Sequence, residues 1–138
     1  MRLWHKDLID VLPRQQLLAQ WRELCSIYSK EDRHILINFI YDYPPNHFYT
    51  YSLLVIDEMR KRGYKISESS YKRFTDYFQN RKFKKINIQT LYNNKMNDRY
   101  LYQCYHNLQE KYDCNSIKEF EWALIENKLK EKITVTEK

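Results

Sequence analysis

Two adjacent charged residues, Arg22 and Glu23, could perform chemistry together, since one is a guanidinium and the other a carboxylate. They occur in the run RQQLLAQWREL. On a helical wheel both lie away from the apolar residues of this run, beside the small residues Ala19 and Ser26. Small residues let a ligand backbone approach such a face. A solvated helix surface and a substrate-binding face both fit this pattern.

The apolar residues of the same run predict the helix that would present this face. Leu17, Trp21, Leu24 and Tyr28 recur at spacings of three and four and form one stripe. Pro13 suits the first turn of a helix, where its missing N–H has no partner to lose.

Further amphipathic patterns predict the remaining helices. They are HFYTYSLLVIDEMRKR, the shorter SYKRFTDYF, NDRYLYQCYHNLQEKY and SIKEFEWALIENKLKEK. The inward residues of the first are Phe48, Tyr51, Val55 and Met59, and those of the third are Leu101, Tyr105, Leu108 and Tyr112.

Residues at the helix ends agree with these boundaries. Gly63 can adopt the left-handed conformation that ends the MRKRG helix. Asn97 or Asp98 can cap the next long helix, and Ser116 with Glu119 matches a capping box for the last.

The predicted fold is all-α: a compact single-domain bundle of about four to five helices with irregular loops. One glycine and three prolines are too few for strands joined by tight hairpins. We assign residues 1–138 to one domain, with a frayed tail over about 133–138, and find no internal repeat.

Several classes of protein are excluded or disfavoured. No run approaches the roughly eighteen apolar residues of a membrane span, and the N-terminus has no apolar core of a signal peptide. Three widely spaced cysteines favour reduced thiols in the cytoplasm. The four histidines show no metal-ligand spacing, so we expect no metal site. Each histidine is interpreted as structural or surface, although His5 could line a site near the N-terminus.

A net charge of +6 and a pI near 9.1 are compatible with a polyanionic partner, although many basic domains bind no nucleic acid. The segment NRKFKK places Arg81, Lys82, Lys84 and Lys85 in an expected loop. This loop either contacts phosphates or is a solvated run of charges. Most of the thirteen tyrosines are expected to pack, and a few could stack on bases.

The order and spacing of four segments resemble the pyrimidine dimer DNA glycosylase family, which includes the phage enzyme endonuclease V. The segments are MRL, RQQLLAQWREL, EMRKRGYKI and NLQEKY. The opening is also similar to a bacterial branch of that family. An N-terminal arginine combined with the Q-x-x-x-x-x-x-R-E-L helix is the more specific part of the resemblance.

The resemblance implies a base-excision glycosylase with abasic-site lyase activity, which uses the α-amino group of the chain as nucleophile. An α-amine ordinarily has a pKa of about 7.7–8.0 and a lysine one of about 10.4, so at neutral pH the α-amine is far more often neutral. The implied partner is damaged double-stranded DNA, and the resemblance implies that no metal or other cofactor is needed. We expect a cytoplasmic, nucleoid-associated monomer that does not bind a membrane.

Carried onto this sequence, the resemblance implies Met1 as the amine donor and Glu23 as the catalytic carboxylate. The large Arg2 side chain should prevent removal of Met1. The implied DNA-binding residues are Arg2, Gln15, Arg22 and Lys111. We expect Arg2, Arg22 and Lys111 to line one basic groove around Glu23.

The sequence also departs from the family. Ser26 and Asn107 stand where the phage enzyme has arginines, Gln16 stands where it has a histidine, and its aromatic C-terminal tail is replaced by KEKITVTEK. These departures concern the substrate more than the chemistry, and the resemblance implies cyclobutane dimers as the substrate. A related glycosylase for another modified or damaged base, and a non-catalytic helical nucleic-acid-binding module, are the alternatives.

Overall fold

The protein is all-helical, as predicted. In the computed structural model, residues 1–30, 34–78 and 83–136 are described, with side chains as far as Ile133, and they contain helices and no strand. The elements are the 3-10 helix η1 (Lys6–Val11), α1 (Arg14–Ser29), η2 (Asn38–Asp42), α2 (Pro45–Lys61), α3 (Glu68–Phe78), η3 (Ile88–Thr90), α4 (Asp98–Asp113) and α5 (Glu119–Thr136).

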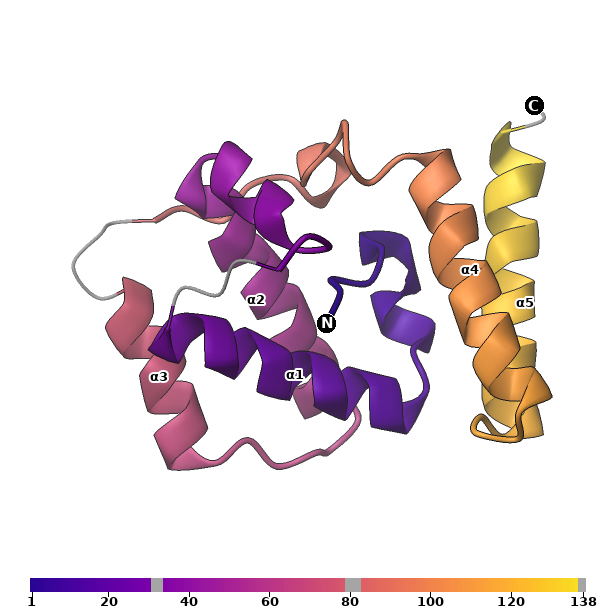
Figure 1. Cartoon of the computed structure of the whole chain (residues 1–138), viewed down its shortest axis with the longest axis horizontal. Coiled ribbons are helices and arrows are strands. Elements are labelled where there is room, and N and C mark those ends of the chain that lie inside the picture. Colours follow the sequence, from indigo (N-terminus) through magenta and orange to yellow (C-terminus); the bar gives the residue numbers. More distant parts are fainter. Residues whose placement is uncertain (31–33, 79–82, 137–138) are drawn as a thin grey trace.

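The helices surround the first residues of the chain. Helix α1 packs against α2 and α3, whereas α4 and α5 pack as a pair at the other end of the molecule (Figure 1). The helix η1 lies between these two groups and contacts both α2 and α5. The amino terminus therefore lies in the middle of the fold, and Leu3, Trp4 and His5 are buried there.

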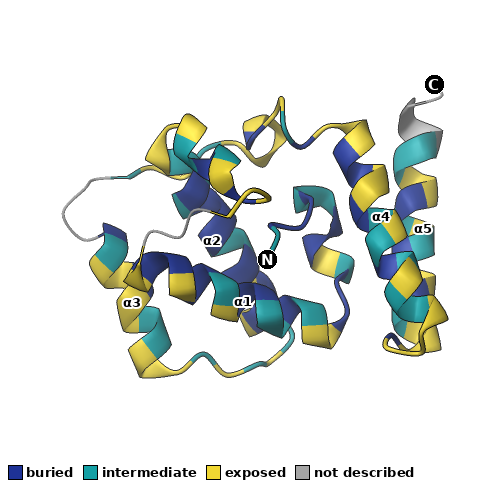
Figure 2. Ribbon diagram, in the orientation of Figure 1, coloured by how far each residue is buried: buried dark blue, intermediate teal, exposed yellow. Residues whose placement is uncertain are grey.

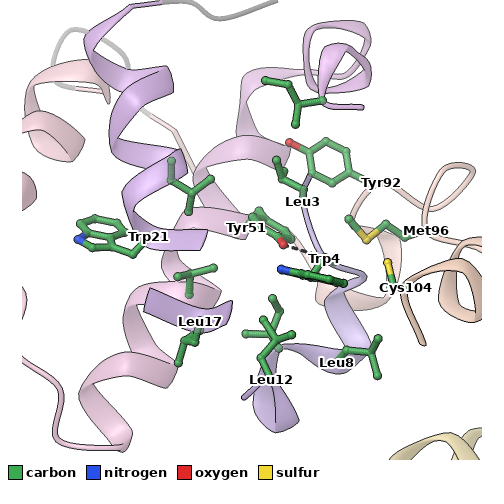
Figure 3. Close-up of a cluster of buried hydrophobic side chains, with 14 of the residues drawn as sticks. Leu3, Trp4, Leu8, Leu12, Leu17, Trp21, Tyr51, Tyr92, Met96 and Cys104 are labelled. Carbon is green, nitrogen blue, oxygen red and sulfur yellow. Dashed lines mark hydrogen bonds between the residues drawn. The ribbon is translucent and has the colours of Figure 1, made fainter. Parts of the chain in front are cut away.

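The predicted apolar stripes of α1 and α2 face the core. All eight of their residues are buried, including Leu17 and Trp21 of α1 and Tyr51 of α2, which meet Leu3, Trp4 and Tyr92 in one cluster (Figures 2 and 3). Burial of such side chains is the main term that favours folding.

The predicted stripe of α4 is buried only in part. Leu101 and Leu108 are buried, whereas Tyr105 and Tyr112 are half-buried. Both tyrosine rings pack on Trp122 of α5, at centroid separations of 5.2 and 5.0 Å. They lie at the edge of the contact between the two helices, where one side of each ring remains accessible.

The predicted helix ends are confirmed for α2 and α4. Gly63 has φ 80°, and the N–H of Tyr64 donates to the Met59 carbonyl at 2.9 Å, which is the hydrogen bond of a Schellman motif. Asn97 caps α4, since its side chain accepts from the Tyr100 N–H at 2.9 Å.

The capping box predicted at Ser116 and Glu119 is wrong. The N–H of Ser116 donates to the Lys111 carbonyl at 2.8 Å and Asn115 has φ 65°, so Ser116 completes the end of α4. Helix α5 begins at Glu119, and the carboxylate of Glu121 accepts from the Lys118 N–H at 3.2 Å. The capping glutamate is therefore two residues later than expected.

Two further expectations concern the loop and the tail. Within NRKFKK, Arg81 and Lys82 lie outside the described residues, and Lys84 and Lys85 are exposed and outside any helix. Helix α5 continues to Thr136, into the segment expected to fray, and residues 137–138 lie outside the described part. Among the helices described, none is sufficiently long and apolar to cross a bilayer.

Candidate active site

Gln20 of α1 connects the amino-terminal segment to Glu23. Its side chain is completely buried. Its amide nitrogen donates to the Arg2 carbonyl at 3.0 Å and to Glu23 Oε2 at 3.1 Å. Its oxygen accepts from the Trp4 N–H at 2.9 Å. Because these bonds use both amide hydrogens, they fix the orientation of the Gln20 side chain and thereby one oxygen of Glu23.

Tyr51 of α2 completes this network. Its hydroxyl lies 2.9 Å from Gln20 Oε1 and 2.7 Å from the Trp4 carbonyl oxygen (Figure 3). The ring is fully buried, and burial raises the pKa of the Tyr51 hydroxyl well above its ordinary value. The hydroxyl thus stays protonated and acts as a donor that holds the amino-terminal segment against α1 and α2.

The carboxyl group of Glu23 is half-buried beside the chain terminus. Burial raises its pKa above the ordinary value of 4.5. Four groups act in the opposite direction: the charged amino terminus, a hydrogen bond from the Arg2 backbone, and the charges of Arg22 and His34. A desolvated carboxylate near an amine, a guanidinium and an imidazole can both stabilise positive charge and accept a proton.

The side chain of Arg2 lies between the amino-terminal segment and α4. Its guanidinium lies 5.8 Å from the Trp4 ring and 5.9 Å from the Tyr100 ring, and it approaches the Cys104 sulfur at 3.9 Å. These contacts orient the guanidinium between aromatic rings. The Tyr100 hydroxyl donates to the Leu3 carbonyl at 2.5 Å and so attaches α4 to the amino-terminal segment.

An open groove of about 640 Å³ begins at Arg2 and follows α4. Its other basic residues are Lys95, whose ammonium lies 4.6 Å from the Tyr100 ring, and the exposed Arg99. Tyr102 and His106 stack on its wall, with ring centroids 6.5 Å apart. Cations that flank exposed aromatic rings are the combination that binds a nucleic-acid backbone and its bases.

The expected site residues are brought together in part. Met1, Arg2, Arg22 and Glu23 meet at the amino terminus, as the network and the electrostatics of Glu23 indicate. Gln15 is exposed in the first turn of α1, seven residues from Arg22, which places the two about 10 Å apart on one helix face. It lines a separate hollow with Pro13, Arg62 and Tyr64.

Lys111 lies in the last turn of α4 and is half-buried. It is seven residues beyond Cys104, so it lies about 10 Å further along the same side of the helix that meets Arg2. Lys111 is not among the residues that line the groove of Arg2.

The histidines and cysteines have other environments. His5 is buried: Nδ1 accepts from the Asp7 N–H at 3.1 Å, so Nε2 donates to the Met96 carbonyl at 3.0 Å, and burial lowers its pKa. His5 is therefore structural.

Burial raises the pKa of the Cys25 thiol to about 11 and raises that of Cys104 as well, so neither is a nucleophile at neutral pH. No metal-ligand cluster occurs among the described residues.

Sequence reasoning missed four contributors: Gln20, the hydroxyl of Tyr51 as a hydrogen-bond donor, and the cations Lys95 and Arg99. A glutamine at an otherwise apolar helix position was the available signal for Gln20, because a buried amide must find partners. Nothing local marked Lys95 or Arg99, since their importance comes only from their position next to Arg2.

The fold and the site define a small all-helical domain with a half-buried carboxylate beside its amino terminus and a basic, aromatic groove. Residues 1–72, just over half of the chain, match the family model of the pyrimidine dimer DNA glycosylases. The chain belongs to this family of DNA repair glycosylases, and DNA is its substrate. No curated protein and no solved structure gives a significant match. The matched residues include Met1 and Glu23 but not Lys111 or the α4 side of the groove.

Proposed function

We propose that the protein excises a UV-damaged pyrimidine, a cyclobutane dimer, and nicks the strand at the resulting abasic site through a Schiff base on Met1. The observation that carries this proposal is the meeting of the chain terminus with Glu23. The charged amino terminus acts on the Glu23 carboxyl, and Gln20 joins that carboxyl to the backbone of Arg2. Amine and carboxylate are thus held together before substrate binds.

In the first step, the neutral amine of Met1 attacks C1′ of the damaged nucleotide. The C1′–N bond breaks, and the base leaves with the bonding electrons and takes a proton from water. The ionised Glu23 stabilises the positive charge that develops on the sugar. Loss of one amine proton and opening of the sugar at O4′, which takes up a proton, leave a protonated imine between Met1 and C1′.

In the second step, Glu23 removes a proton from C2′. The electron pair expels the 3′ phosphate as the C3′–O bond breaks, so the strand is nicked by β-elimination. Water then hydrolyses the imine and releases Met1. The half-buried position of Glu23 suits this work, because a carboxylate with few water contacts is a stronger base.

The groove along α4 supports DNA as the substrate of this chemistry. Arg2 and Arg99 offer guanidinium groups to phosphates, and Tyr102 offers a ring face to an unpaired base. Arg22, exposed next to Glu23, can hold a phosphate on the other side of the reacting sugar. A DNA substrate favours a place in the cytoplasm with the nucleoid. We propose that the protein acts there as a monomer.

Borohydride trapping tests the chemistry. The protein should form a covalent adduct with a dimer-containing or abasic duplex, and acetylation of its N-terminus should abolish the adduct because an amide nitrogen has no available lone pair. The matched control is Glu23→Gln, which should still bind DNA but turn over slowly. Equal nicking by blocked and free protein would assign the nucleophile to another group and refute the role of Met1.

The substrate is tested with duplexes that carry a dimer, an oxidised base, an abasic site or no lesion. We expect excision at the dimer and nicking at the abasic site. Nicking at the abasic site alone would restrict the protein to the lyase step, and binding without any nicking would support a non-catalytic module.

A further inference from the structure

Two large apolar side chains are exposed side by side in the turn that precedes η2. Ile35 is 85% exposed and Leu36 is 40% exposed, and the next residue, Ile37, is completely buried. Single exposed apolar residues are common on protein surfaces. Two adjacent apolar side chains in a turn beside a candidate active site contribute little to folding, and such exposed apolar pairs indicate a binding surface.

The position of the turn connects it to the site. Leu36 lines the groove that begins at Arg2 and follows α4. His34, which directly precedes Ile35, is one of the groups that act electrostatically on the Glu23 carboxyl and lower its pKa. The turn that carries Ile35 and Leu36 therefore adjoins the basic groove through Leu36 and follows a residue that acts on the candidate catalytic carboxylate.

Hydrogen bonds hold the backbone of this turn. The His34 carbonyl accepts from the N–H groups of Ile37 and Asn38, both at 2.9 Å, and the ring Nδ1 of His34 accepts from the Leu36 N–H at 3.2 Å. Burial of Ile37 attaches the turn to the core. Ile35 and Leu36 are thus presented from a defined backbone.

We propose that Ile35 and Leu36 form an apolar wedge that enters the base stack of the bound duplex next to the damaged nucleotide. The proposal rests on the proposed function, because extraction of a nucleotide leaves a gap that apolar side chains can fill. The interior of a base stack is apolar, and the cations Arg2 and Arg99 on one side of the turn are placed for the phosphates that flank the gap. The wedge accounts for apolar exposure in the middle of a charged surface.

The test compares wild-type protein with Ile35→Ser and with the double variant Ile35→Ser/Leu36→Ser. The matched control is Ile88→Ser on η3. The side chain of Ile88 is 36% exposed, which is similar to the exposure of Leu36, and it lines neither the groove along α4 nor the hollow beside Gln15. Since the substituted side chains are exposed, thermal unfolding should confirm that all variants fold. Each protein is assayed under single turnover on a dimer duplex and on a single strand that carries an abasic site.

We expect the double variant to excise the dimer at least roughly tenfold more slowly, because unstacking of the base step is no longer compensated. Nicking of the single-stranded abasic substrate, which needs no unstacking, should change by no more than about twofold, the range of a neutral surface substitution. The control should match wild type on both substrates. Equal rates for variant and wild type on the dimer, or equal losses on both substrates, would overturn the wedge.

A second readout needs no catalysis. A duplex with 2-aminopurine next to the lesion should brighten when wild-type protein binds and stay dim with the double variant. This separates the two proposals: brightening without nicking retains the wedge and rejects the chemistry, whereas nicking without brightening does the reverse. Sedimentation of the free protein tests a further possibility. If wild-type protein is a homodimer and the substitutions separate its two copies, the two residues belong to a contact between protein copies and the wedge is wrong.

Discussion

Replacement of Gln20 by methionine is expected to damage both the fold and the site. Methionine fills a similar volume but neither donates nor accepts a strong hydrogen bond. The Trp4 N–H, which is buried, and the Arg2 carbonyl, which is half-buried, both lose their side-chain partner. Glu23 loses the donor that orients it.

The magnitude follows from these orphaned groups. A buried N–H without a partner costs about 1–3 kcal/mol, and a carbonyl that water can reach in part costs about 0.5–1.5 kcal/mol, so the loss is about 1.5–4.5 kcal/mol. With an unfolding entropy of about 2.1 cal/mol/K per residue, a chain of 138 residues loses about 3 °C in Tm for each kcal/mol. Gln20→Met should therefore lower Tm by roughly 5–14 °C.

The assay is thermal unfolding by circular dichroism, together with single-turnover excision at a temperature where the variant is folded. Gln15→Met is the matched stability control, because it makes the same change at an exposed position of the same helix. It should leave the free energy of unfolding within about 0.5 kcal/mol of wild type. A Gln20→Met protein with unchanged Tm and unchanged excision rate would refute the role assigned to this network.

Three further predictions concern charged residues. Burial raises the pKa of Glu23, so the folded state loses stability as pH rises from 4.5 through the raised value. Glu23→Gln removes this loss. Urea unfolding should therefore show that the variant gains more free energy of unfolding over wild type at about pH 7 than at about pH 4. Arg99→Gln should reduce the slope of log affinity against log salt by about 0.9, and an unchanged slope would exclude Arg99 from the DNA interface. Arg62→Met removes the side-chain donor of the Leu12 carbonyl and of the Glu58 carboxylate, and it leaves the Ile9 carbonyl with the Leu12 N–H alone. The expected cost is about 2–4 kcal/mol, which an unchanged urea midpoint would contradict.

The sequence determined the local features of this protein. Leu17, Trp21 and Leu24 repeat with helical period, so α1 had one face for the core and left Arg22 and Glu23 off that face. Gly63 ends α2 because glycine adopts positive φ without strain. Such features depend on residues within one or two turns of each other, and a pattern can therefore predict them.

Tertiary structure decided which distant residues share the site. Gln20 is a polar residue among many in the sequence, and its role arises only because Trp4 and Tyr51 fold onto it. Ser116 shows a different limit, because two local motifs can use it: its N–H donates to the Lys111 carbonyl at the end of α4, so the next helix begins later, at Glu119. The groove likewise exists only because α4 packs beside Arg2. Periodicity fixes the face of each helix, but the hydrogen bonds and burial that join separate elements depend on how those faces pack.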